Sequence, residues 1–180
     1  RQRPQHPTAI PNSGGWTTWD ASRRVLWGHA GDDGGGNAFI GFHPDGDNGN
    51  GTFGRWTDRF PNKLPGIANH NAMQIEPLRD TIVVSVHARD ELHALDPDDP
   101  AREIVRLRSA GPKPVLRPFA ALEHAPNIAR LVYFSPLDDG IVYTIAPPRE
   151  RDSGSGSSGT WSWEAHAPPE ETLQPIADAA

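Results

Sequence analysis

The sequence has no cysteine, and Met73 is its only methionine. Without cysteine the chain can hold no disulfide framework, zinc–thiolate site, iron–sulfur cluster or cysteine nucleophile, and its redox compartment stays undetermined. No apolar run approaches the roughly 20 residues that span a bilayer, and the first residues do not form a signal-peptide core. We therefore expect no membrane partner. Because the chain begins at Arg1, we also expect it to be either processed or cut from a longer chain.

Positive charge is also scarce. Lys and Arg number 17 against 23 Asp and Glu, giving a formal net charge of −6, and the acidic residues are spread along the chain. This balance argues against a nucleic-acid surface or a polybasic membrane patch. A chain of 180 residues is long enough for one core and short for two, so we expect a single globular domain.

A convincing helical pattern is also missing. The 18 glycines and 19 prolines punctuate short runs rich in Val, Ile, Phe, Tyr and Trp, which is the strand-and-turn pattern of an all-β domain. The nearest approach to a helix is the tail at 170–180, which we expect to form one turn or to fray.

An internal repeat organises these strands. Three segments align without gaps at offsets of 56 (77 − 21) and 49 (126 − 77), and each is predicted to be a tight turn leading into a buried strand. The segments are 21–27 (ASRRVLW), 77–83 (PLRDTIV) and 126–132 (PNIARLV).

The neighbouring strands repeat as well. The next strand aligns at offsets of 53 (92 − 39) and 50 (142 − 92) and ends in proline each time, where we expect it to stop because proline lacks the ladder donor. These third strands are 39–44, 92–97 and 142–147. Fourth strands are predicted at 54–57, 103–107 and 159–163, and inner strands at about 15–20, 72–76 and 119–124.

Four strands per unit at a period near 50 residues resemble the blades of the kelch and galactose-oxidase-like β-propeller superfamily. The resemblance rests on the strand order, the repeated turn, the proline-ended third strand and the Gly-x-Trp of the fourth, and covers residues 16–165. It implies blades at about 12–60, 66–110 and 115–168, with a flexible tail at 169–180. The second and third units lack the double glycine that kelch blades usually carry after the second strand. A β-sandwich is the alternative.

Three blades do not close a ring, since propellers have typically four to eight. Each end of the array would then expose apolar side chains of a blade meant to be covered. Either two copies pair into a six-bladed ring, or the chain is half of a longer one. The expectation we favour is a homodimer.

Polar residues just before the inner strands are the candidate ligand-binding residues, because those positions should meet at one mouth of the ring. They are Asn12, Ser13, Asn69, His70, Asn71 and Arg117. Asp45, Asp47 and Asn50 suggest a calcium loop, but their spacing departs from the EF-hand pattern and turn chemistry explains them more simply. We predict no metal and no cofactor.

Other residues have structural explanations. The acidic pairs Asp32-Asp33, Asp90-Glu91 and Asp138-Asp139 are typical of hairpin turns. Galactose-oxidase copper chemistry is excluded, because the chain has no cysteine and its two tyrosines, Tyr133 and Tyr143, lie in predicted buried strands. Most tryptophans are expected to anchor the core, although an exposed indole could stack on a sugar ring.

Two functions are compatible with this pattern. The first, which we favour, is a non-catalytic binding or scaffold module that presents a polar ring mouth to a protein or a glycan. The second is a sugar-active lyase or hydrolase with a site near His70 and Arg117. We favour the binding hypothesis because the sequence shows no nucleophile with its base, and no paired acid and base, at a recognisable spacing.

Overall fold

The computed structural model describes residues 16–29, 39–47, 53–56, 71–99, 104–138, 140–148 and 159–168. These residues form an all-β structure of three sheets, with one short 3-10 helix, η1 (His87–Arg89). Apart from β9 in the third sheet, the strands of each sheet follow one another in chain order. Within these residues no helix is long and apolar enough to cross a membrane. The predicted all-β class is therefore confirmed.

The first and second sheets are four-stranded antiparallel meanders. The first contains β1 (Trp16–Asp20), β2 (Val25–His29), β3 (Phe39–Asp47) and β4 (Phe53–Trp56). The second contains β5 (Ala72–Glu76), β6 (Thr81–Val86), β7 (Glu91–Leu95) and β8 (Val105–Arg106).

The third sheet has five strands, one more than the sequence predicted. The four predicted strands are β10 (Ala121–Ala125), β11 (Arg130–Phe134), β12 (Val142–Ala146) and β13 (Thr160–His166). The additional strand, β9 (Arg108–Ala110), pairs in parallel with β13 at the outer edge. Because β9 directly follows β8, the chain passes from the edge of the second sheet to the edge of the third.

The repeated turn is the same in all three sheets. Arg24, Asp80 and Ala129 occupy equivalent positions, and their φ angles are +54°, +52° and +50°. This left-handed conformation reverses the chain between the inner strand and the next strand of each sheet. The sequence repeat is therefore also a repeat of backbone geometry.

One expected strand end is wrong. The third strand of the first unit was predicted to stop at Pro44, but β3 continues to Asp47. The pairing of β3 with β4 shifts register between His43 and Asp47, so the strand accommodates the proline at an irregularity instead of ending there. In the other two units the strands end before Pro97 and Pro147, at Leu95 and Ala146.

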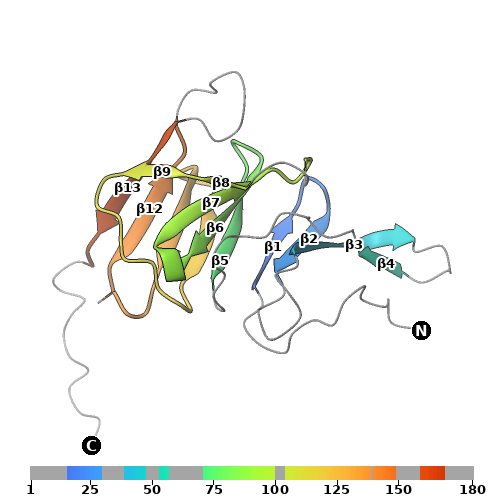
Figure 1. The fold of residues 1–180 in the computed structure, drawn as a ribbon, viewed down its shortest axis with the longest axis horizontal. Helices are drawn as coiled ribbons and strands as arrows, with labels where there is room; N and C mark the ends of the chain where they lie inside the picture. The colour runs from blue at the N-terminus through green and yellow to red at the C-terminus, as the bar shows by residue number, and fades with distance from the viewer. Residues whose placement is uncertain are drawn as a thin grey trace, which may run out of the picture.

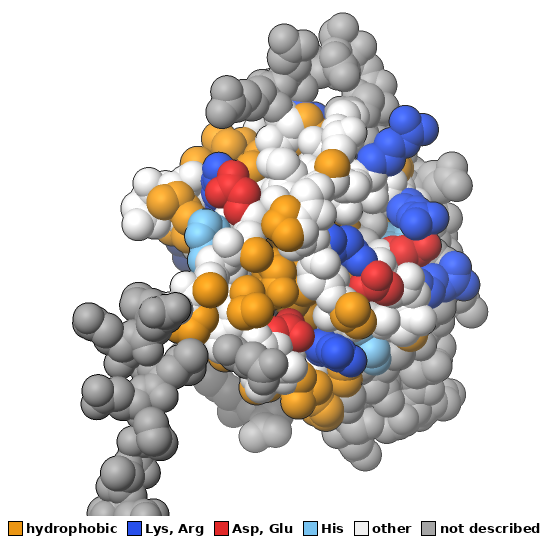
Figure 2. Space-filling model, turned by 90° about the vertical axis from the view of Figure 1, so that its left-hand side faces the viewer, with side chains coloured by type: hydrophobic (Ala, Val, Ile, Leu, Met, Phe, Trp, Pro, Cys, Tyr) orange, Lys and Arg blue, Asp and Glu red, His pale blue; other side chains and the backbone are white. Residues whose placement is uncertain are grey.

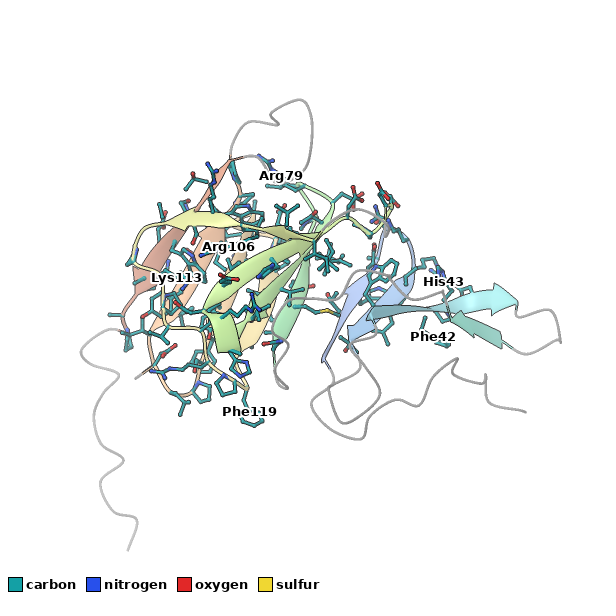
Figure 3. All side chains as sticks on the ribbon, in the orientation of Figure 1. Phe42, His43, Arg79, Arg106, Lys113 and Phe119 are labelled. Carbon is teal, nitrogen blue, oxygen red and sulfur yellow. The ribbon has the colours of Figure 1, made fainter. Side chains whose placement is uncertain are left out.

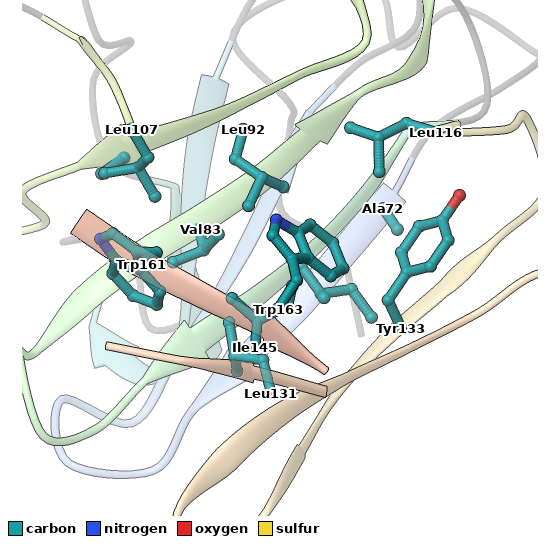
Figure 4. Close-up of a cluster of buried hydrophobic side chains, with 12 residues drawn as sticks. Ala72, Val83, Leu92, Leu107, Leu116, Leu131, Tyr133, Ile145, Trp161 and Trp163 are labelled. Atoms are coloured by element: carbon teal, nitrogen blue, oxygen red, sulfur yellow. The ribbon is translucent and has the colours of Figure 1, made fainter. Parts of the chain in front are cut away.

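The three sheets stack face to face, with the second in the middle (Figure 1). One buried cluster joins the first and second sheets, and includes Val25, Trp27, Ile82, Val84 and Leu95. Another joins the second and third sheets (Figure 4). Successive residues of β6 therefore point alternately toward the first sheet and the third sheet, and all six of its residues are buried.

Aromatic residues dominate the larger cluster. Trp161 and Trp163 are buried on β13, and the ring of Trp163 meets those of Tyr133 and Tyr143 edge to face, with centroids 6.0 and 6.3 Å apart. Such rings bury large apolar areas and prefer this T-shaped arrangement. The predicted burial of Tyr133 and the predicted core roles of Trp27 and Trp161 are confirmed.

The inner strands of the three sheets lie side by side, with β5 between β1 and β10. Their first residues and the β6–β7 and β11–β12 loops lie at one end of the stack, and the repeated turns lie at the other. Figure 3 shows Phe119, just before β10, and Arg79, in the turn after β5, at these opposite ends.

Candidate binding groove along the inner strands

Three polar side chains at one repeat position link the inner strands. Thr18, Gln74 and Glu123 are spaced by the repeat offsets of 56 (74 − 18) and 49 (123 − 74). The Thr18 hydroxyl donates to Gln74 Oε1 at 2.5 Å, and Gln74 Nε2 donates to Glu123 Oε2 at 2.8 Å. We call this chain of hydrogen bonds the inner-strand ladder.

A groove of about 570 Å³ lies beside the ladder, toward the end of the inner strands that carries the repeated turns. Its lining combines an aromatic surface with polar groups, since Trp19 is 47% exposed and lies with Gln74 and His124. The other lining residues are Asp20, Ala21, Ser22, Ile75, Pro77 and Asp80. Trp19, Ile75 and His124 are again repeat equivalents, so each inner strand contributes the same position to the groove.

Arg23 fixes the carboxylates at the turn end of the groove. Its guanidinium donates two hydrogen bonds to Asp80, at 2.7 and 2.6 Å, and two to Asp98, at 2.8 and 2.5 Å. It also contacts Asp20 Oδ2 at 3.0 Å. Three carboxylates therefore share one guanidinium, so this end of the groove carries excess negative charge.

Asp20 is buried but remains ionised. Burial alone would raise the pKa of its carboxyl group. Hydrogen bonds from the Arg23 backbone N–H, the Ser22 hydroxyl, the Trp27 indole and the Arg23 guanidinium outweigh burial, and the pKa lies below its usual value. The Arg23 guanidinium likewise lowers the pKa of Asp98.

Glu76 shows that this carboxylate position is structural in origin. It is the repeat equivalent of Asp20, is fully buried, and accepts the backbone N–H groups of Leu78 and Arg79 at 3.2 and 2.8 Å. Burial raises its pKa despite those bonds. The carboxylates of Asp20 and Glu76 therefore hold the turns in place, and the groups left for a ligand are on the ladder and at the groove surface.

The predicted mouth residues that the structure describes lie at the other end of the inner strands. Asn71 is buried, and its Oδ1 accepts the backbone N–H of His87 at 3.1 Å, which fixes the start of η1. The Arg117 backbone N–H donates to the Tyr133 hydroxyl at 2.7 Å, and its Nε lies 3.9 Å from Asp138 Oδ1. Neither residue lines the groove.

The remaining predicted site residues, Asn12, Ser13, Asn69 and His70, lie outside the described residues. The hypothesis of an enzyme site near His70 and Arg117 therefore stays a prediction. Of the calcium candidates, Asp45 forms an ion pair with Arg24 at 2.6 Å, Asp47 ends β3, and Asn50 is not described. The described residues contain no cluster of three or more His, Asp or Glu that could hold a metal ion.

The acidic pairs behave as turn residues where they are described. Asp90 adopts a φ of +53° at the end of η1, and Glu91 begins β7. Asp90 also accepts hydrogen bonds from Lys113 and from the Leu116 backbone N–H, so it holds the segment that leads into β10. The pair Asp32-Asp33 is not described.

No protein-family model, curated protein or solved structure matches this chain.

Proposed function

We propose that this chain is a non-catalytic binding protein built from propeller-like blades, and that it binds a neutral glycan in the groove along its inner strands. The observation that carries the proposal is the half-exposed indole of Trp19 beside the polar groups of Gln74, His124 and Ser22. Sugar rings offer an apolar C–H face to an aromatic ring and hydroxyl groups to amides and carboxylates. Binding sites commonly combine such an apolar wall with a few placed polar groups.

The blade arrangement is supported by the repeat. The same four-strand order, the same left-handed turn position and the same inner-strand positions recur three times. Inner strands that lie side by side about one line are the arrangement by which propeller blades surround a central channel. In that arrangement the groove is a segment of the channel wall.

The charge of the groove favours neutral ligands over acidic ones. Asp20, Asp80 and Asp98 share the single guanidinium of Arg23, and Glu123 adds a further carboxylate at the end of the ladder. An anionic sugar would meet uncompensated like charge. We therefore expect neutral oligosaccharides to bind, and uronic acid polymers to be excluded.

Isothermal titration calorimetry with neutral hexasaccharides of glucose, mannose, xylose and N-acetylglucosamine tests this function. We expect at least one of them to bind, and the Trp19→Ala variant to weaken that binding by roughly tenfold or more, because it removes the stacking surface. Phe119→Ala is the matched control, since Phe119 is an aromatic side chain that is 68% exposed at the opposite end of the inner strands.

Two results would contradict the proposal. One is the absence of heat with every neutral hexasaccharide, and the other is equal affinity of the wild-type protein and the Trp19→Ala variant. Binding that is lost instead in Arg117→Ala would move the site to the mouth predicted from the sequence.

A further inference from the structure

The outer face of the first sheet contains apolar positions that are less buried than their equivalents in the second sheet: Trp19 is 47% exposed, and Leu26 and Phe42 are partly buried. This face, turned away from the second sheet, contains the paired residues Trp19, Leu26 and Phe42. Their equivalents in the second sheet are Ile75, Ile82 and Leu95, which face the first sheet, and Ile82 and Leu95 are buried there.

The third sheet also has apolar residues on its outer face. Its outer face, turned away from the second sheet, includes Val132, Phe134 and Val142, and Phe134 is 41% exposed. The equivalents of Val132 and Val142 in the second sheet, Val83 and Leu92, are buried against the third sheet. The side of the molecule where β12 and β13 lie shows hydrophobic side chains mixed with oppositely charged pairs (Figure 2).

Polar groups on this outer face are already paired with one another. Arg130 Nη1 lies 2.6 Å from Glu164 Oε2 and donates to Thr144 Oγ1 at 3.2 Å, and Thr144 Oγ1 lies 3.0 Å from His166 Nε2. A neighbouring sheet could therefore cover the face without leaving these charges unpaired.

We propose that a second copy of this chain seats the outer face of its first sheet on the outer face of the third sheet, and that the same contact forms again on the opposite side. The contact repeats the geometry that already joins the first sheet to the second and the second to the third. Two identical head-to-tail contacts between two copies form a closed assembly of six sheets, which leaves neither face open. This inference rests on the propeller-like arrangement of the proposed function.

The second copy would also complete the groove. Within one chain, each inner strand offers its ladder residue to the next sheet, from Thr18 to Gln74 and from Gln74 to Glu123. The Glu123 carboxylate lies at the open end of this sequence, where the first inner strand of the partner would follow. Trp19 would then lie between two sheets, as Ile75 and His124 do, and those two residues line the groove from that position.

Light scattering coupled to gel filtration gives the first test. We expect a mass of twice 19.6 kDa for the wild-type chain, and a shift to the monomer mass in Phe134→Glu. Val115→Glu should stay dimeric, because Val115 is 57% exposed in the loop before β10 and off both outer faces. Circular dichroism checks that both variants are folded.

Crosslinking tests the orientation, since a chain without cysteine allows clean single-cysteine variants. A mixture of Leu26→Cys and Phe134→Cys chains, treated with a short bismaleimide, should give a crosslinked pair that neither variant gives alone. Crosslinking of Leu26→Cys to itself would overturn the head-to-tail contact. A wild-type monomer at 50 µM would overturn the dimer. Glycan binding by such a monomer would leave the proposed function standing. A dimer that binds no glycan would overturn the proposed function but not the dimer.

Discussion

Arg23 connects two sheets through charged hydrogen bonds, whereas its neighbour Arg24 does not. Arg23 is only 18% exposed and bonds Asp20 of its own sheet together with Asp80 and Asp98 beside the second sheet. Removing one partner of a buried charge network leaves the other charges uncompensated. We expect Arg23→Ala to lower the free energy of unfolding by about 2 kcal/mol, less than for a fully buried pair because part of the network is solvated.

The neighbouring arginine supplies the control. Among the described residues, Arg24 forms an ion pair with Asp45 alone, and both side chains are exposed. We therefore expect Arg24→Ala to leave the urea midpoint unchanged. Urea unfolding followed by tryptophan fluorescence measures both variants. Equal destabilisation would mean that the three carboxylates do not depend on the Arg23 guanidinium.

His93 should make the stability depend on pH. Burial lowers its pKa, although Glu91, 3.0 Å away, opposes this effect. The unfolded state therefore takes up the proton first, at a pKa of about 6.5. This group has no effect on stability above that pH, and destabilises the fold as the pH falls through the folded pKa.

The test of His93 compares urea unfolding at pH 7.5 and 5.5 in the wild-type chain and in His93→Gln. The glutamine retains a donor for Glu91 but does not titrate, so we expect its loss of stability over this range to be smaller. Identical losses in the two proteins would assign the pH dependence to other groups.

At the scale of strands and turns, the sequence predicted most of the architecture. The repeat located every strand from β1 to β8 and from β10 to β13, with offsets of 56 and 49 for the turn and second strand and of 53 and 50 for the third strand. Short apolar runs between Gly, Pro and Asp turns carry a strong local signal. The repeat missed β9, whose three exposed residues pair in parallel with a strand about 50 residues away. Nothing local to Arg108–Ala110 encodes that pairing.

The segment after β9 depends on a glycine. Gly111 has a φ of +95°, and a Cβ atom there would lie 2.3 Å from the Trp163 carbonyl oxygen. We expect Gly111→Ala to lower the free energy of unfolding by about 3 kcal/mol. The alanine would have to adopt a strained backbone conformation, and backbone atoms around Trp163 would also have to move.

Gly140 separates the effect of the positive φ angle from the effect of the close contact. It also has a positive φ, +77°, but its Cβ would meet only Pro168 Cγ at 3.8 Å. Gly140→Ala should therefore cost about 1 kcal/mol, from the backbone conformation alone. Thermal unfolding of both variants measures the difference, and a Gly140→Ala variant as unstable as Gly111→Ala would argue against the close approach to Trp163.

At the scale of the whole molecule, the candidate site was harder to predict than the fold. Loop position pointed to Asn71 and Arg117, and that site stays a prediction; Asn71 Oδ1 and the Arg117 backbone N–H form contacts that hold the loops. The groove depends on which residues meet when three inner strands lie side by side, which no single segment encodes. The available signal was the alignment of Thr18, Gln74 and Glu123 at the repeat offsets, polar residues at one position of three strands.

The stacking order also predicts where the molecule is most stable. The second sheet is covered on both faces, and all six residues of β6 are buried, whereas the first and third sheets each have one outer face. Amide exchange from the native state follows local burial and opening. In hydrogen exchange measured by mass spectrometry, we expect peptides covering β6 and β7 to retain protection longest, and those covering β2 to lose it sooner. A second copy on the outer faces would raise the protection of β2 and β11 with increasing protein concentration, while β6, already covered within one chain, would change least.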